Sequence, residues 1–265
     1  MSTPTVAPPP RLTGTVDGAV RRVPLGRLVR VETRKTVDTR SGTWALVAIA
    51  VVTIGLLTVN IATGDPDDLT FRDFARSTSL TLLLPVLAIL VITTEWTQRT
   101  ALTTFTLEPQ RVRVVLAKLL AVTVIALLAL AFALVAAAVG NVAASALADG
   151  SGAWRFGAGD VRDLVLLQLL SMLQAFAFGL LLMNTTAAIF VYYVVVPLVS
   201  SAFALVRPLE DLAPWLELGT ATAPIGTGTV TAETWAHVAV AGSLWVLLPL
   251  GLGVVRLLRR EIKAG

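Results

Sequence analysis

The chain has 265 residues, of which 55% are hydrophobic and 14% charged, and its mean hydropathy is +0.80. Globular domains contain about 45–50% apolar and about 25% charged residues, so a single soluble core is excluded. The sequence has no cysteine and one histidine, which excludes disulfides and cysteine metal sites. We expect His237 to be an interfacial side chain rather than a ligand. Because no G-x-x-x-x-G-K-[ST] phosphate loop occurs, we expect no nucleotide hydrolysis by this chain.

The N-terminal part changes character near residue 25. Residues 1–24 are rich in proline and contain no apolar run, which predicts a disordered cytoplasmic tail. Residues 25–40 combine apolar and basic positions at helical spacing, which predicts a short amphipathic helix in the inner headgroup layer. The alternative is a simple cluster of positive charge before the first span. Residues 25–265 are the predicted transmembrane domain.

Six apolar segments predict membrane spans. They are Trp44–Ala62, Thr78–Thr94, Val114–Leu147, Val161–Met183, Ala187–Val206 and Trp235–Arg256. The expected fold class is therefore an all-α polytopic membrane protein with six transmembrane helices and an N-terminal interfacial helix. The third segment is longer than one bilayer crossing requires, so we expect it to tilt or to project beyond the membrane.

The basic residues predict the orientation of these spans. With the N-terminus inside, 16 of the 21 Lys and Arg residues fall on the inner side, and this bias is the signal that sets topology. We therefore expect a multi-pass protein of the plasma membrane with both termini in the cytoplasm. Topology and contact with anionic membrane lipid account for the basic charge, so nucleic acid is not an expected partner.

A polar segment from Glu95 to Lys118 separates the second and third spans on the inner side. Its first part has one apolar side and one polar side, as expected for a short helix parallel to the membrane. Pro109 has no N–H to donate, so we expect a turn there before the third span begins. A helix of this kind offers a partner a surface to grip, whereas the alternative is a solvated loop.

Residues 25–256 resemble the permease subunit of ABC-2-type (type V) ABC transporters. The likeness consists of the interfacial helix, the six spans and a segment of the form Glu, Arg-Thr, Leu-x-Pro-x-Arg, Lys. The residues that match this form are Glu95, Arg99, Thr100, Leu107, Pro109, Arg111 and Lys118. In that family the segment is the coupling helix, which docks into a groove of a separate ATPase subunit. The family pattern more often has a glycine where this chain has Thr100 or Ala101, and often one in place of Ala117.

The resemblance implies the membrane subunit of an ATP-driven exporter for an amphipathic or lipid-like substrate. It implies an ABC ATPase subunit as partner, with ATP and Mg²⁺ on that ATPase and no cofactor or catalytic residue in this chain. It also implies a dimer with a second permease copy or a paralogue. The alternatives are an ion-coupled secondary transporter, which needs ionisable residues near the bilayer midplane, a membrane-embedded enzyme and a non-transporting immunity-type membrane protein.

Polar side chains in the fourth and fifth spans are candidates for a substrate path. Gln168, Ser171 and Gln174 are three residues apart, which places them on one broad face of a helix. Tyr192 and Tyr193 follow in the next span. Buried amides are costly in hydrocarbon unless they meet partners or water. These side chains therefore either bond neighbouring helices or line a polar path.

Other features of the sequence have two interpretations each. Small residues at intervals of four within Ala129–Ala144 predict close helix packing, either inside the chain or at a dimer seam. Glu95 either pairs with Arg99, four residues later, or transmits ATPase motion into the second span. The uncharged outer stretch 218–232 is expected to rest on the membrane or dip into it, and Pro197 is expected to kink the fifth span.

Overall fold

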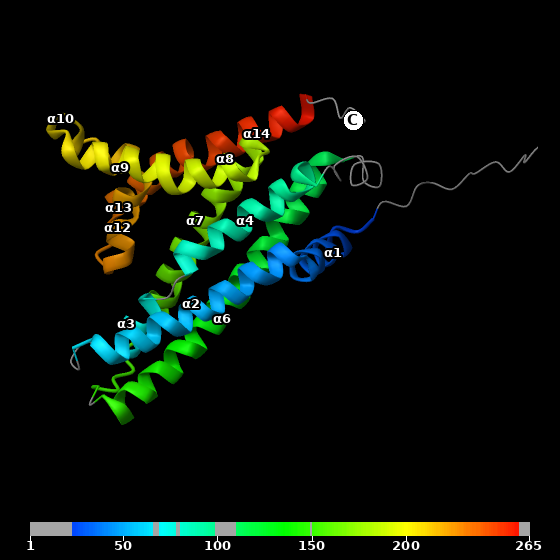
Figure 1. The fold of residues 1–265 in the computed structure, drawn as a ribbon. Coiled ribbons are helices and arrows are strands. Elements are labelled where there is room, and N and C mark those ends of the chain that lie inside the picture. Colours follow the sequence, from blue (N-terminus) through cyan, green and yellow to red (C-terminus); the bar gives the residue numbers. More distant parts are fainter. Residues whose placement is uncertain (1–22, 66–68, 78–79, 99–109, 149, 260–265) are drawn as a thin grey trace, which may run out of the picture.

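The computed structural model describes residues 23–65, 69–77, 80–98, 110–148 and 150–259. Every regular element in these ranges is a helix, and no strand occurs among them (Figure 1). A helix satisfies its backbone hydrogen bonds within one segment, which is the reason that an apolar chain of this composition adopts this class. The predicted all-α class is confirmed, whereas the predicted tail lies almost wholly outside the described residues.

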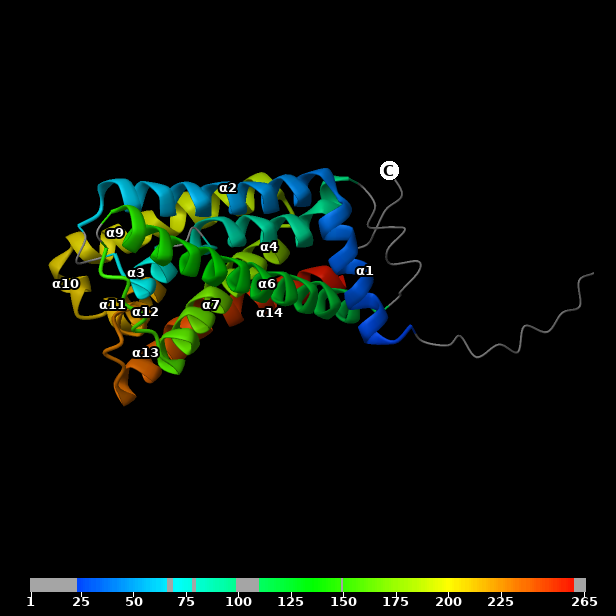
Figure 2. The same cartoon turned by 90° about the horizontal axis from the view of Figure 1, so that it is seen from below.

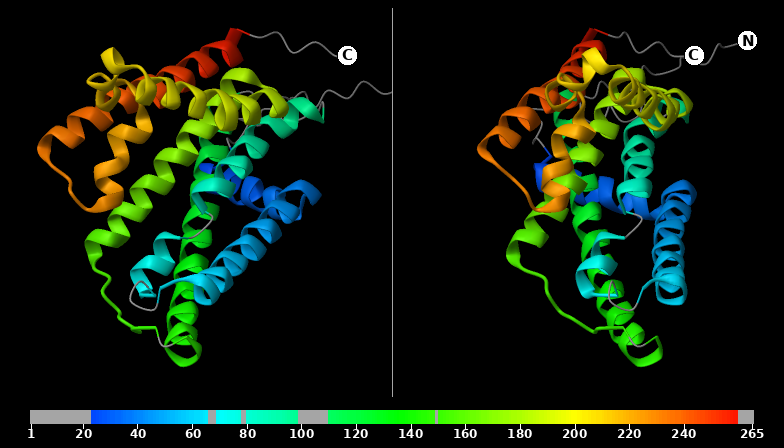
Figure 3. Two further views of the ribbon diagram at one scale, coloured as in Figure 1. Left: turned by 60° about the vertical axis from the view of Figure 1, so that its left-hand side comes forward. Right: turned by 90° about the vertical axis from the view of Figure 1, so that its left-hand side faces the viewer.

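Five helices are long and apolar enough to cross a membrane. They are α2 (Arg40–Thr63), α6 (Arg111–Leu147), α7 (Ala158–Leu182) and the two composite helices Thr185–Leu205 and Ala232–Arg259. By length and hydropathy the chain is thus a candidate multi-pass membrane protein. The α6 helix has 37 residues, which at 1.5 Å per residue spans about 55 Å, against about 30 Å for the hydrocarbon core. The predicted excess length of this segment is confirmed, and the C-terminal end of α6 projects beyond α2 (Figure 3).

The second predicted span corresponds to α4 (Leu80–Thr97). Its apolar part, Leu82–Thr97, is shorter than the five long helices, so the six expected spans appear as five long helices and one short one. The α4 helix nevertheless lies at the centre of the bundle, where Leu87, Ala88 and Ile89 have no exposed surface. It packs against α7, α2 and α6.

The α1 helix (Leu25–Asp38) crosses one end of the bundle at a steep angle to α2 (Figure 2). Thr39 alone separates the two helices, and its Oγ1 accepts a hydrogen bond from the Gly42 N–H at 3.4 Å, which caps α2. The corner is so tight that a Cβ on Gly42 would lie 1.8 Å from the Thr36 carbonyl oxygen. The predicted helix over residues 25–40 is thus present as α1, whereas its position in the inner headgroup layer stays a prediction.

Both composite helices contain one π-helical turn. Their parts are α8 (Thr185–Phe190), η2 (Val191–Val195) and α9 (Val196–Leu205), and α13 (Ala232–Gly242), η3 (Ser243–Leu247) and α14 (Leu248–Arg259). Pro197 and Pro249 are the second residues after these turns. Proline removes the hydrogen bond to the residue four positions before it, so the irregularity predicted at Pro197 takes the form of a π-helical turn.

Short helices gather at the end of the bundle opposite α1 (Figure 2). They are α3 (Phe71–Arg76), α10 (Arg207–Glu210), α11 (Ala213–Leu216) and α12 (Leu218–Thr227). Asp160 at the start of α7 pairs with Arg72 and Arg76 of α3 at 3.0 and 3.3 Å, which fastens this end. The uncharged outer stretch is largely α12, which buries Ala221 and Ile225 and packs against α7 and α13.

The stripe of small residues on α6 is buried inside the chain. Ala133, Ala137 and Ala144 have no exposed surface. A Cβ on Gly140 would lie 3.6 Å from ring atoms of Phe74 on α3. The small residues let α6 approach its own neighbours closely, so the alternative interpretation of this stripe as a dimer seam is wrong.

Candidate functional site

Four charged side chains from three helices meet at the end of the bundle that α1 covers. The Lys118 Nζ lies 2.7 Å from the Glu32 Oε2 and 3.1 Å from the Glu95 Oε1, and it also donates to the Val91 carbonyl oxygen at 3.3 Å. The Lys35 Nζ lies 3.0 Å from the Glu95 Oε1. This four-charge cluster (Glu32, Lys35, Glu95 and Lys118) therefore joins α1, α4 and α6.

The cluster is largely removed from solvent. The side chains of Lys118 and Glu95 are 2% and 3% exposed, that of Glu32 is 11% exposed and that of Lys35 is 36% exposed. Taking one ion out of water costs several kcal/mol even after the surroundings relax. Two carboxylates alternating with two ammonium groups offset this cost, so removal of any one member leaves the cluster with one unit of uncompensated charge.

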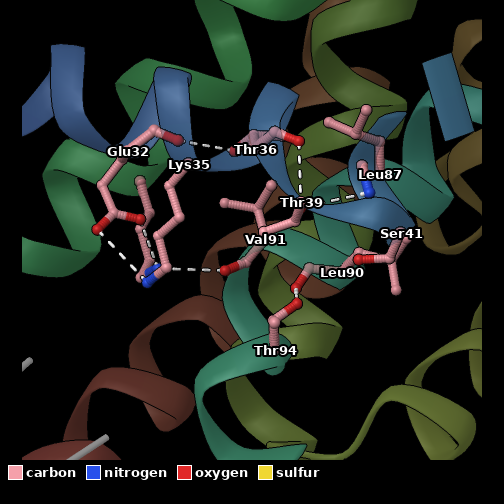
Figure 4. A pocket seen from close by; sticks show the side chains of 11 residues that line it. Glu32, Lys35, Thr36, Thr39, Ser41, Leu87, Leu90, Val91 and Thr94 are labelled. Carbon is pink, nitrogen blue, oxygen red and sulfur yellow. Dashed lines mark hydrogen bonds and ion pairs between the residues drawn. The ribbon is translucent and has the colours of Figure 1, made fainter. Parts of the chain in front are cut away.

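The surface between α1 and α4 is a contact rather than a ligand pocket. Figure 4 shows Glu32 and Lys35 on α1 beside Leu87, Val91 and Thr94 on α4. The hollow between these elements has a volume of about 20 Å³, which is room for about one water molecule. The α1 helix therefore packs on α6 and α2 and is joined to α4 by the ion pair of Lys35 with Glu95.

Three of the seven predicted coupling residues lie in the described part of the chain. The other four, Arg99, Thr100, Leu107 and Pro109, lie outside the described residues. The predicted coupling helix and the alternative pairing of Glu95 with Arg99 therefore stay predictions. Glu95 and Lys118 bound the predicted segment and form an ion pair. Arg111 donates from Nη1 to the Leu257 carbonyl oxygen of α14 at 2.6 Å. Both ends of the segment are thus tied to the bundle.

Sequence reasoning missed Glu32 and Lys35 as partners of this segment. The pattern of residues 25–40 predicts a basic amphipathic helix but assigns no partner to its single acid before Asp38. The available signal was the acid itself: Glu32 stands among basic residues, four positions before the buried Thr36. An acid on the inner face of a basic helix needs a cation from elsewhere in the fold.

A cavity of about 580 Å³ lies between α7, the η2–α9 part of the fifth long helix and α12. This volume falls within the range of about 300–1,000 Å³ that small-molecule sites occupy. Ser171, Gln174, Tyr192 and Tyr193, four of the five predicted pathway residues, line it. Gln168 lines a separate cavity of about 250 Å³ nearer the start of α7. We call the larger space the α7–α12 cavity.

The two tyrosines of the α7–α12 cavity bond neighbouring helices. The Tyr192 hydroxyl donates to the Ser171 carbonyl oxygen of α7 at 3.3 Å, and the Tyr193 hydroxyl donates to the Leu82 carbonyl oxygen of α4. The two rings meet edge to face with their centroids 4.8 Å apart. These two tyrosines therefore bond neighbouring helices and also line the cavity, whereas a substrate path through it stays a prediction.

Glu217 contributes the one carboxylate among the described residues that line the α7–α12 cavity. Its Oε1 accepts from the Ser200 hydroxyl at 2.7 Å and the Gly219 N–H at 2.9 Å, and its Oε2 accepts from the hydroxyl and N–H of Thr220. Burial acts to raise the pKa of Glu217, but the hydrogen bonds from Thr220, Ser200 and Gly219 outweigh it and lower the pKa. The carboxylate is therefore ionised at neutral pH and caps the N-terminus of α12.

The fold and these sites define a helical, candidate multi-pass membrane protein with a buried charge cluster at one end and, among its helices, a cavity lined by both polar and apolar side chains. Comparison of the chain with models of known protein families finds no match, and neither does a search of curated proteins. The function must therefore be argued from the residues and their geometry.

Proposed function

We propose that this chain is the membrane-spanning permease subunit of an ATP-driven ABC exporter, with α4 as a sixth span and both termini in the cytoplasm. The observation that carries the proposal is the ion pair between Glu95 and Lys118 at 3.1 Å, because it draws together the two ends of the predicted coupling segment. A segment whose ends are held in packed helices passes a displacement on to those helices.

In this proposal a separate ABC ATPase subunit binds ATP and Mg²⁺ and grips residues 97–110. Closure of the ATPase moves the segment, and the force enters α4 near Glu95 and α6 near Arg111 and Lys118. The α4 helix packs along α7, which lines the α7–α12 cavity. Close-packed helices transmit such shifts as rigid elements. The chain thereby converts motion of the partner into a change at the cavity and needs no catalytic residue of its own.

A second permease copy or a paralogue is proposed to complete the transporter. Among the five long helices, the apolar windows of Thr185–Leu205 and Arg40–Thr63 are buried least within the chain, at 6% and 17%. Such faces are available to lipid or to a second subunit. We propose that part of this surface forms the dimer interface and that the rest contacts the bilayer of the plasma membrane.

An ion-coupled secondary transporter is a second candidate, because the four-charge cluster contains buried carboxylates of the kind that carry protons in such proteins. The cluster is internally balanced and lies at the end of the bundle rather than near its middle, which favours the ABC proposal. The two candidates differ in their energy source: transport into proteoliposomes that requires ATP and the ATPase, with no pH gradient, supports the exporter and contradicts the ion-coupled alternative.

The direct test is co-purification with an ABC ATPase encoded beside this chain in its genome. We expect the ATPase to co-purify with the wild type and with Gln168→Leu, a matched control far from the segment. We expect the complex to be lost when residues 97–110 are replaced by a glycine–serine linker of equal length, while the yield of folded chain in the membrane is retained. Retention of the ATPase by the linker variant would refute the coupling assignment.

A further inference from the structure

Glu217 is the exception among the buried acids of the described residues. Glu32, Glu95 and Asp163 are similarly buried, and each has a Lys or Arg nitrogen within 3.0 Å of its carboxylate. Glu217 is 6% exposed, and no basic side chain of the described residues pairs with it or lines the α7–α12 cavity beside it. Buried charges are normally paired, so a carboxylate without a cation at the wall of a cavity needs an explanation.

The fold does not require a charge at this position. Glu217 caps the N-terminus of α12, where its Oε1 accepts from the Gly219 N–H at 2.9 Å. An uncharged Asn or Ser caps a helix as well as an acid does. The other donors to the carboxylate, from Ser200 and Thr220, solvate its charge without cancelling it. The start of α12 supplies the equivalent of about half a positive charge, so about half a negative charge remains at the cavity wall.

The polar side chains of the α7–α12 cavity present acceptors to a ligand. The Nε2 of Gln174 is buried, so the side-chain oxygen is the polar atom that this residue has left for the cavity. Each hydroxyl of the cavity donates its hydrogen to an oxygen of the chain and keeps lone pairs that can accept. These hydroxyls belong to Ser171, Tyr192, Tyr193, Ser200, Ser201 and Thr222. A ligand that bonds to these side chains must therefore bring the donors.

The rest of the wall is apolar. Leu167 and Leu170 of α7, Val196 and Pro197 of α9 and Leu218 of α12 line the cavity beside its polar groups. In small-molecule sites such walls hold the body of the ligand, and a few polar groups fix its orientation. An anionic ligand would meet a like charge here and no cation. A matching ligand therefore has an apolar body and a positively charged donor.

We infer that the α7–α12 cavity binds an amphipathic organic cation, whose ammonium group supplies the positive charge that Glu217 lacks. An ammonium group has donors and no acceptor, so it matches the acceptors of this wall as well as its charge. The apolar body of the ligand lies against Leu167, Leu170 and Val196. That such a cation is the export substrate rests on the proposed function, whereas the binding itself does not.

The test is equilibrium binding of three dansyl probes to the full chain in phosphatidylcholine nanodiscs at pH 7, with empty nanodiscs as background. Dansylcadaverine ends in an ammonium group, N-hexyl dansylamide has a methyl group in its place, and 6-(dansylamino)hexanoic acid has a carboxylate there. Half a unit charge at about 6 Å, with an effective dielectric constant of about 20, changes an affinity about tenfold. We therefore expect dansylcadaverine to bind saturably and about tenfold more tightly than the uncharged probe, and the carboxylate probe to bind most weakly.

Glu217→Gln removes the charge and keeps an acceptor at the start of α12. We expect it to weaken dansylcadaverine binding about tenfold and to change binding of the uncharged probe less than about twofold. Glu217→Asn, which keeps an uncharged cap, decides the matter if the glutamine variant does not fold. Glu233→Gln is the matched control, because it removes the same charge from a side chain that is 74% exposed and lines a different cavity. We expect this control to bind all three probes as the wild type does.

Four results would overturn the inference. They are the absence of saturable dansylcadaverine binding, equal affinity for the cationic and uncharged probes, an equal effect of a folded Glu217 variant on both of these probes, and an equal effect of Glu233→Gln and Glu217→Gln on dansylcadaverine binding. An equal effect on both probes would assign Glu217 to the structure of α12 alone. Since no ATPase is present, failure here leaves the co-purification result intact, and loss of ATPase binding with intact cation binding refutes only the exporter.

Discussion

Replacement of Lys118 by methionine removes the most deeply buried cation of the four-charge cluster and roughly keeps the length of the side chain. The Lys118 side chain is 2% exposed and its Nζ lies 2.7 Å from Glu32 and 3.1 Å from Glu95. In the variant, both carboxylates lose the buried ammonium group that bridges them, so the cluster keeps one unit of uncompensated negative charge. Breaking a buried ion pair in this way costs about 3–5 kcal/mol. Because 1 kcal/mol shifts Tm by about 2–4 °C in chains near this size, we expect Tm to fall by roughly 10 °C.

The assay is thermal unfolding of the purified chain in detergent, followed by tryptophan fluorescence. Arg34→Met is the control for loss of a cation from the same region, because the Arg34 side chain is 83% exposed in its pair with Asp38 and surface pairs contribute little. The double variant Glu95→Gln/Lys118→Met removes one charge of each sign, so we expect it to regain much of the lost stability. A Lys118→Met variant that unfolds at the same temperature as Arg34→Met would refute the reasoning.

Two further predictions concern Glu217 and Gly42. The pKa of Glu217 lies below its ordinary value of 4.5, so its contribution to stability is complete above pH 4.5 and is lost as the pH falls through the lowered pKa. Glu217→Gln is therefore expected to lower the free energy of unfolding by roughly 2 kcal/mol at pH 7. The Tm difference between wild type and variant is expected to shrink as the pH falls. A Tm difference that does not change with pH would contradict this. Gly42→Ala places a Cβ 1.8 Å from the Thr36 carbonyl oxygen and is expected to lower Tm by several degrees. Gly55→Ala is the control, because a Cβ there meets nothing within 4 Å. This control is expected to stabilise α2 by about 0.5–1 kcal/mol. Equal Tm values for the two alanine variants would contradict the tight corner.

The long helices could be predicted from the sequence because hydropathy and length are local properties. The apolar runs that form α6 and α7 predict spanning helices from their own residues alone, without reference to the rest of the chain. The α4 helix shows the limit of this reasoning. Its apolar part is short, and its burial in the middle of the bundle depends on packing against α7, α2 and α6, which no single stretch of sequence reveals.

The four-charge cluster could be predicted only in part. The sequence pattern identifies Glu95 and Lys118 as the two ends of one segment, but Glu32 is 86 residues away from Lys118 along the chain. Their contact exists because the corner at Gly42 turns α1 back over the bundle. A contact that depends on the direction of a helix after a one-residue turn lies beyond residue patterns.

Helical geometry explains why the candidate pathway residues Gln168 and Gln174 line two different cavities. Gln168 and Gln174 are six residues apart, and at 100° per residue they point about 120° apart around α7. Ser171 lies between them in angle as in sequence. Spacing by three kept the residues on one broad face, yet the width of that face is enough to send Gln168 to a different cavity from Gln174.

The single residue between α1 and α2 links the chain to the thickness of its bilayer. A spanning helix tilts when the hydrocarbon layer becomes thinner than its apolar length. Thr39 alone connects the two helices, and a Cβ at Gly42 would clash with the Thr36 carbonyl oxygen, so tilting of α2 must move α1 with it. Lys118 on α6 holds α1 through its ion pair with Glu32. A change in the tilt of α2 that moves α1 therefore changes the distances within the four-charge cluster.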